Sequence, residues 1–157
     1  MRVIFVTGPA FSGKSIFIGQ NYPEAKLLSM ETFVTNIYGA ESNDQMKLIG
    51  EYAHLYCREG LQNMIRMANE NDIIIFEHIM LKKETRKFFL EAVREVTSVP
   101  VEIVVMCPSE KDLEKMFRNM PQLLSLYRYE EAKMEKPDLS EGFGSVSFVR
   151  PLVAEME

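Results

Sequence analysis

The stretch Gly8-Pro9-Ala10-Phe11-Ser12-Gly13-Lys14-Ser15 decides the fold of this chain. It matches the pattern G-x-x-x-x-G-K-[ST], the phosphate-binding P-loop motif. Glycines in such a loop let several backbone N–H groups point at one anion. Lys14 then adds a positive charge that reaches the β- and γ-phosphates, and Ser15 offers a hydroxyl to Mg²⁺ where a helix begins. The motif predicts binding of ATP and Mg²⁺.

The residues on both sides of the motif fit a strand, loop and helix in that order. Val3-Ile4-Phe5-Val6 is a short apolar, β-rich run, as expected for a buried parallel strand. The residues from Ser15 to Gln20 can form a helix. A glycine-rich turn without a ligand is the alternative, but it does not explain a lysine and a serine at their two positions. We therefore assign Gly8 to Ser15, together with Ile16, to nucleotide binding.

Length and composition indicate one globular domain over residues 1–157. The chain has 157 residues and 46% hydrophobic residues, enough for a sizeable core. It contains no run of 18 apolar residues, and Met1 leads directly into the first expected strand, so we expect neither a membrane span nor a signal peptide. Cys57 and Cys107 are too few for a disulfide framework and are expected in the core, which favours a cytoplasmic protein.

The net charge of −5 weighs mildly against a strongly basic nucleic-acid-binding protein. An enzyme that acts on a polynucleotide end needs only a local basic patch, so the charge does not exclude one.

Apolar runs alternate with helical stretches along the chain. The expected strands cover residues 2–7, 26–29, 72–77, 101–107 and 145–149. The expected helices cover residues 31–38, 44–69, 83–97, 110–119 and 123–132, with a loop at 137–144. This order predicts a three-layer α/β P-loop NTPase fold, with a parallel sheet of about five strands and helices on both faces. Ligands of such sheets bind at the carboxyl ends of the strands.

Acidic side chains follow two of these strands. Glu31 lies just after the second strand, where its carboxylate can accept the proton of an attacking hydroxyl or serve only as a first-turn helix acid. Glu77 closes the third strand, where a carboxylate holds the Mg²⁺ shell or orients the acceptor, unless it is a solvated strand end. His78 beside it is expected to pack or position rather than to act as a base.

Two arginines flank the break expected at Pro121. Phosphoryl transfer requires positive charge over the β- and γ-phosphates, and Arg118 and Arg128 on a short helical lid, about residues 118–133, would supply it. The alternative is that both are ordinary surface arginines. Ser109 is expected to cap the helix before the break, with Asp112 three residues later.

Together these segments resemble P-loop kinases of the 5′-hydroxyl polynucleotide kinase type, in the adenylate-kinase-like and zeta-toxin-like group. Leu28-Ser29-Met30-Glu31-Thr32-Phe33 is similar to the end of the family's second strand, with Glu31 at its general-base Asp. Ile73-Ile74-Ile75-Phe76-Glu77-His78-Ile79-Met80-Leu81 resembles its apolar strand followed by Asp-Thr-Asn-Leu, with Glu77 at the Asp.

The resemblance continues into the second half of the chain. Phe117-Arg118-Asn119 is similar to the lid's Arg-Asn segment. Pro137-Asp138-Leu139-Ser140-Glu141-Gly142-Phe143-Gly144 resembles the Pro-x-x-x-Glu-Gly-Phe-Asp ending before the last strand. The resemblance implies that Arg150, just after that strand, borders the adenine. Phe11 stands where the family's P-loop usually has Gly, and both proposed acids are Glu instead of Asp.

The sequence therefore predicts a Mg²⁺-dependent kinase in which Lys14, Glu31, Arg118 and Arg128 act in catalysis, and Ser15 and Glu77 hold the metal. The expected acceptor is the 5′-hydroxyl of a single-stranded DNA or RNA end. A small-molecule acceptor such as a nucleoside, nucleotide, sugar or antibiotic is the first alternative. A non-catalytic, regulatory nucleotide-binding module is the second. The sequence does not indicate an oligomeric state.

Overall fold

The computed structural model describes residues 1–30 and 43–151 of the chain, with side chains described from residue 52 in the second range. The helix expected at residues 31–38 and the proposed base Glu31 lie outside the described residues. Within them, the order of strands and helices follows the expected α/β alternation.

The centre of the molecule is a five-stranded parallel sheet with the order β2-β3-β1-β4-β5. The strands are β1 (Arg2–Thr7), β2 (Lys26–Ser29), β3 (Ile73–Glu77), β4 (Val101–Met106) and β5 (Ser145–Val149). They match the expected strands to within one residue. The P-loop follows β1, which lies between β3 and β4, so the motif sits in the middle of the sheet's carboxyl edge.

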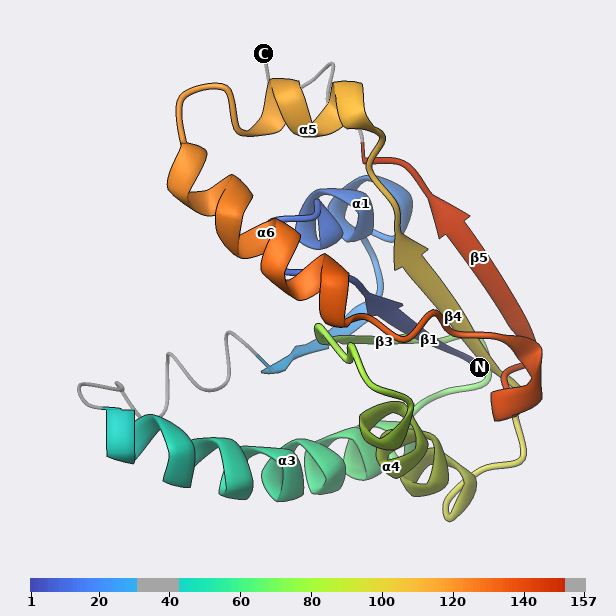
Figure 1. Ribbon diagram of the computed structural model, residues 1–157. Coiled ribbons are helices and arrows are strands. Elements are labelled where there is room, and N and C mark those ends of the chain that lie inside the picture. The colour runs from blue at the N-terminus through green and yellow to red at the C-terminus, as the bar shows by residue number, and fades with distance from the viewer. Residues whose placement is uncertain (31–42, 152–157) are drawn as a thin grey trace.

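Helices cover both faces of this sheet, which confirms the three-layer fold (Figure 1). The described helices are α1 (Lys14–Asn21), α3 (Asn43–Arg66), α4 (Lys83–Arg94), α5 (Glu110–Met116) and α6 (Pro121–Lys133), and a short 3-10 turn, η1, spans Leu139–Glu141. Figure 1 shows α3 and α4 below the sheet, and α1, α5 and α6 above it. Among the described helices, none is both long and apolar enough to cross a membrane.

Alternating side chains of the strands build two separate cores. Val3 and Phe5 point toward α3 and α4 and pack in one cluster with Phe89. Ile4 and Val6 point the other way and pack with Ile18 of α1. Because successive side chains point to opposite faces and both faces of the sheet are buried, these residues form a continuous apolar run.

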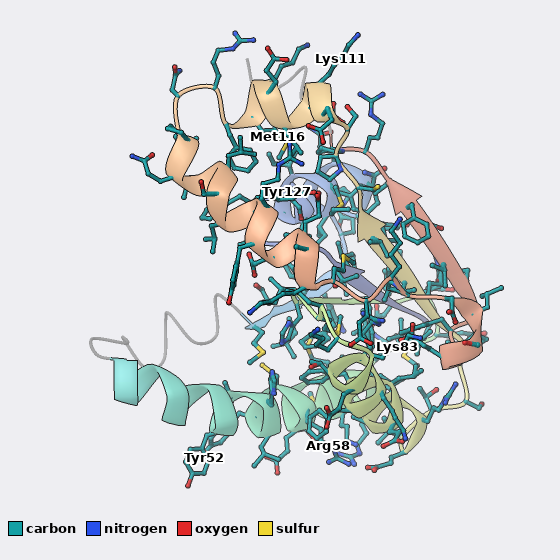
Figure 2. The ribbon with its side chains drawn as sticks, in the orientation of Figure 1. Tyr52, Arg58, Lys83, Lys111, Met116 and Tyr127 are labelled. Atoms are coloured by element: carbon teal, nitrogen blue, oxygen red, sulfur yellow. The ribbon has the colours of Figure 1, made fainter. Side chains whose placement is uncertain are left out.

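A third, smaller core joins α5 to α6. It is formed by Leu113, Met116, Phe117 and Tyr127, and Figure 2 shows Met116 and Tyr127 on the inner sides of the two helices. The expected cap of α5 is confirmed: Ser109 accepts from the backbone N–H of Asp112, and the Asp112 carboxylate accepts from the backbone N–H of Ser109. This packing holds α5 and α6 together as one unit.

Two expectations from the sequence need correction. The expected break between two helices near Pro121 is present, but the second helix begins at Pro121 and not at Leu123, because proline lacks only an N–H that a first-turn residue does not need. Cys57 is buried as expected, but Cys107 is exposed because β4 ends at Met106 and the cysteine lies in the following loop.

Candidate functional site

The P-loop turns at two glycines that no other residue replaces without strain. Gly8 has φ 146° and Gly13 has φ 96°, both in the region that side chains other than glycine rarely adopt. A Cβ built on Gly13 would lie 2.8 Å from the Cβ of Pro151, so the segment after β5 packs against the loop at a place where only glycine fits. The motif thus forms a tight cradle on the N-terminus of α1, the arrangement that binds phosphate.

Lys14, the first residue of α1, folds back over the cradle. Its side chain is buried, and its Nζ donates to the backbone oxygens of Gly8 at 3.0 Å and Pro9 at 2.9 Å. A buried ammonium held by carbonyl oxygens is a fixed positive charge at the loop, where it can meet phosphate oxygens without reorganisation.

Ser15 and Glu77 meet beside this cradle, although they lie 62 residues apart. The Ser15 hydroxyl donates to Glu77 Oε1 at 2.8 Å, and the Glu77 carboxylate is buried at the end of β3. Both groups offer oxygen ligands, and Mg²⁺ in nucleotide sites takes one or two protein oxygens and completes its shell with water and phosphate. The pair therefore fits the metal that the motif implies. Among the described residues, no group of three or more His, Cys, Asp or Glu side chains could hold a metal on its own.

A cavity of about 290 Å³ opens over these groups. Its floor is the P-loop with Ser15 and Glu77, and its wall is apolar. The apolar wall comprises Phe11, Ile16, Met116, Phe117, Met120 and Leu123. Ser12 also lines it, and its buried hydroxyl has no hydrogen-bond partner among the described residues. A buried hydroxyl without a partner costs free energy, so a ligand oxygen at this position would be stabilising.

Phe11 is the strained residue of the loop. It adopts φ 64°, in the left-handed region that favours glycine. A side chain in this conformation costs about 1 kcal/mol, and the ring is half exposed at the mouth of the cavity, so packing does not repay the cost. Strain of this kind concentrates at functional sites.

We expect Phe11→Gly to raise the free energy of unfolding by about 0.5 to 1 kcal/mol, because glycine adopts this φ freely. Urea denaturation at neutral pH measures it. Phe11→Ala is the matched control: it removes the same ring but keeps the strained backbone, so it should give no such gain. An equal gain in both variants would show that the exposed ring, and not the backbone, causes the effect.

The turn after Glu77 is fixed by several hydrogen bonds. The Thr7 hydroxyl donates to the backbone oxygen of Ile79 at 2.7 Å, and the backbone N–H of Met80 donates to His78 Nδ1 at 2.9 Å. Met80 has φ 32°, a second positive value outside glycine. A strained turn persists only where its surroundings hold it, and this turn directly follows Glu77 at the carboxyl edge of the sheet.

The buried His78 and the half-buried His54 form a pair behind this turn. Their Nε2 atoms lie 3.2 Å apart, and because His78 Nδ1 accepts from Met80, His78 Nε2 carries the proton and donates to His54. Burial, the neighbouring His54 and the charge of Lys14 lower the pKa of His78 to about 3, and burial also lowers the pKa of His54. His78 therefore packs and positions, as expected, and stays neutral at physiological pH.

The pair makes stability depend on pH. The pKa of His78 falls from 6.5 in the unfolded chain to about 3 in the folded one. The unfolded state thus binds more protons between these values, and stability is lost as the pH falls below 6.5. We expect the free energy of unfolding to drop by about 1 kcal/mol from pH 7 to pH 5.5. Urea denaturation at both pH values measures it, and His78→Gln should reduce the dependence to the part that His54 contributes. A wild-type protein equally stable at both would contradict the assignment.

A buried arginine that the sequence reasoning missed secures the same turn. Arg86 on α4 is fully buried, and its Nε and Nη2 bind the two carboxylate oxygens of Glu141 at 2.7 and 3.1 Å. Its Nη1 donates to the backbone oxygens of Met80 at 3.0 Å and Leu81 at 3.3 Å. The sequence contains a signal for this burial. Arg86 stands at helical spacing from Phe89, Leu90 and Val93, so it lies on the face of α4 that packs against the sheet.

The three arginines predicted at the site lie in different places. Arg118 is exposed in the turn between α5 and α6, next to the cavity-lining Phe117, and has no ion-pair partner in the described part of the chain. Arg128 binds both carboxylate oxygens of Glu110 at 3.0 and 2.7 Å and is not among the residues lining the cavity. Neither arginine is among the residues that line the cavity, and Arg118 differs from Arg128 in being the sequence neighbour of a lining residue and in having its charge unpaired among the described residues.

Arg150 closes the end of β5 onto α5. Its Nε and Nη2 bind the two oxygens of Asp112 at 3.0 and 2.9 Å, and this contact, against some burial, lowers the pKa of Asp112 to about 2. Much of its side chain remains exposed. Its predicted place beside the adenine stays a prediction.

No protein-family model matches the chain, and no curated protein is similar to it in sequence. Solved structures are similar in fold. A protein from Chloroflexus aurantiacus provisionally described as a kinase matches with a TM-score of 0.70 and 13% identity, over 99% of this chain and 91% of that one. A gluconokinase from Sinorhizobium meliloti matches with a TM-score of 0.58 and 17% identity, over 98% and 86%.

The adenylylsulfate (APS) kinase of Mycobacterium tuberculosis, in complex with AMPPNP and APS, matches with a TM-score of 0.56 and 14% identity, over 99% of this chain and 92% of that one. At these identities the likeness concerns the fold. The strand order, the P-loop after β1 and these structures agree: the chain has the fold of the P-loop kinases.

Proposed function

We propose that the protein is a Mg²⁺-dependent phosphotransferase that moves the γ-phosphate of ATP to a hydroxyl group of a small molecule. The observation that carries the proposal is the Ser15–Glu77 hydrogen bond of 2.8 Å beside the P-loop, because it places two Mg²⁺-compatible oxygens next to the buried Lys14. Structural neighbours that are named as kinases of gluconate and of adenylylsulfate support the same class.

Each residue in the proposed site has a definite task. The backbone N–H groups of the loop and the Ser12 hydroxyl bind phosphate oxygens, and Lys14 neutralises the charge that develops during transfer. Ser15 and Glu77 would hold Mg²⁺, which would supply positive charge beside the β- and γ-phosphates. Arg118 closes over the transferring group. The oxygen of the acceptor hydroxyl attacks the γ-phosphorus, and the bond between the γ-phosphorus and the oxygen that bridges it to the β-phosphate breaks, so that ADP leaves. Glu31 takes the proton of the hydroxyl.

Two observations favour a small acceptor over a polynucleotide end. Lys26, one of the few basic residues near the second strand, is bound to Asp72 at 2.8 Å and so adds little net charge for a nucleic acid. The Pro-x-x-x-Glu-Gly-Phe segment, which carries much of the polynucleotide kinase resemblance, has an internal role: Glu141 binds Arg86, and Phe143 is buried against Phe5. That segment therefore says little about the acceptor.

The 5′-hydroxyl of a polynucleotide remains the second candidate, because the order of motifs along the chain resembles that of the polynucleotide kinases. Transfer of label from γ-labelled ATP with Mg²⁺ separates the candidates. The acceptors are a short 5′-hydroxyl oligonucleotide and a panel of sugars, sugar acids, nucleosides and nucleotides. Label on a small molecule supports the proposal. Label on the oligonucleotide alone would show that the acceptor is a polynucleotide end and not a small molecule. ATP binding without transfer to any acceptor would favour a regulatory module.

A further inference from the structure

A carboxylate from α6 accepts a hydrogen bond from the backbone of the P-loop. The backbone N–H of Ala10 donates to Glu130 Oε1 at 3.0 Å, although the two residues are 120 apart in the chain. Ala10 is the third residue of the phosphate-binding motif. The N–H groups of this loop are the donors that bind phosphate oxygens. A carboxylate oxygen of α6 thus holds an N–H of this loop directly beside Phe11 and Ser12, which line the cavity.

The position of Lys14 shows which part of the nucleotide Glu130 would oppose. The Lys14 ammonium donates hydrogen bonds to the carbonyl oxygens of Gly8 and Pro9, the two residues just before Ala10. A P-loop lysine reaches the β- and γ-phosphates. The N–H of Ala10 therefore follows directly on the two carbonyl groups that hold the lysine, which places it on the side of the loop that the terminal phosphates would approach.

The contact also ties α6 to the loop. One turn before Glu130, Tyr127 is buried against Phe117, with ring centroids 6.0 Å apart, and Arg128 binds Glu110 of α5. The α5–α6 unit is thus held together by its own contacts, and Glu130 joins that unit to the P-loop. Figure 1 shows α6 crossing in front of α1 on this side of the sheet.

A carboxylate and a terminal phosphate cannot share this place without cost. Both are anions, and two like charges at contact distance repel strongly in a partly buried site. Glu130 is half-buried, so water screens the repulsion only in part. A γ-phosphate that bound the N–H of Ala10 would have to displace the carboxylate, whereas a diphosphate that did not reach this N–H would leave the contact in place.

We propose that Glu130 is a specificity-determining residue that acts as an internal substitute for the terminal phosphate. It weakens the binding of ATP more than that of ADP, and it links arrival of the γ-phosphate to release of α6 from the P-loop. The inference rests on the proposed function, since it requires that the P-loop binds nucleotides.

Calorimetric titration of Mg²⁺-ATP and Mg²⁺-ADP tests this role. The proteins are the wild type, Glu130→Ala, Glu130→Gln and the control Glu135→Ala, which removes an exposed carboxylate just beyond α6. Loss of a competing charged hydrogen bond should tighten ATP binding by roughly five- to tenfold in Glu130→Ala. ADP binding should change by less than about twofold. Glu130→Gln should lie between, because the amide keeps an acceptor oxygen but loses the charge.

An NMR spectrum without nucleotide gives a second readout that does not depend on affinity. The amide proton of Ala10, bound to a carboxylate in the wild type, should move upfield in Glu130→Ala and stay in place in Glu135→Ala. An unmoved Ala10 signal in Glu130→Ala would overturn the contact itself.

The outcomes separate this inference from the proposed function. ATP affinity that is unchanged or weaker in Glu130→Ala, with wild-type binding intact, overturns the role of Glu130 alone. Equal tightening of ATP and ADP overturns the assignment to the terminal phosphate. If neither nucleotide binds any of the four proteins, the proposed function fails and this inference fails with it.

Discussion

Lys14→Ala is expected to lower phosphoryl transfer by at least about a hundredfold, because it removes a preorganised positive charge from the phosphate site. Lys14 is buried, and its ammonium is already placed at the loop by the oxygens of Gly8 and Pro9. Such a charge stabilises the transition state more than the bound substrate, so the rate of the bound complex should fall more than ATP affinity does. Initial rates at saturating ATP, together with calorimetric ATP binding, measure both effects.

The control for this prediction is Lys111→Ala. Lys111 is an exposed lysine on α5 whose side chain points away from the molecule (Figure 2). It carries the same charge without contact to the cradle, so transfer should stay within about twofold of the wild type. A Lys14→Ala protein that is folded and fully active would contradict the assigned role of the P-loop lysine.

Arg86→Met is expected to lower the free energy of unfolding by about 3 kcal/mol or more, because it leaves a largely buried carboxylate without its partner. The variant loses both bonds to Glu141 and the two bonds to the backbone oxygens of the turn after His78. Urea denaturation at pH 7 measures the loss. Since this turn follows Glu77, Mg²⁺-dependent ATP binding should weaken as well.

Arg94→Met on the same helix is the matched control. Arg94 is exposed and donates to the backbone oxygen of Gly142 at 2.7 Å, so its loss should cost less than about 1 kcal/mol. Adding Glu141→Leu to Arg86→Met should restore part of the stability, because two apolar side chains need no partners. Equal destabilisation by Arg86→Met and Arg94→Met would contradict the importance of the buried ion pair.

The sheet could be predicted from the sequence because its strands are buried on both faces. Runs such as Ile73–Phe76 are apolar at every position, and only a covered parallel strand requires that. The end of the fourth strand was misjudged by one residue at Cys107, since a cysteine is as apolar as the strand before it. The start of α6 was misjudged because proline stops one helix and begins the next equally well.

The meeting of Ser15 and Glu77 could also be predicted, because both lie at the carboxyl ends of neighbouring strands. Ser15 and Glu77 were assigned to the metal from their positions after β1 and β3, and the structure places them in contact. The contacts of Arg128, Arg86 and Glu130 could not be predicted in the same way. Each depends on which residue of a distant element faces it, for example Glu110 for Arg128, and a periodic pattern does not contain that information.

The most direct test of the account is calorimetric titration of ATP into the protein with Mg²⁺ and with EDTA, for the wild type and Glu77→Gln. The account predicts that Mg²⁺ tightens ATP binding to the wild type, and that Glu77→Gln still binds ATP but loses most of the gain from Mg²⁺, because one metal-side carboxylate is gone. A wild-type protein that binds no ATP at millimolar concentration, or a variant with the full gain, would contradict it.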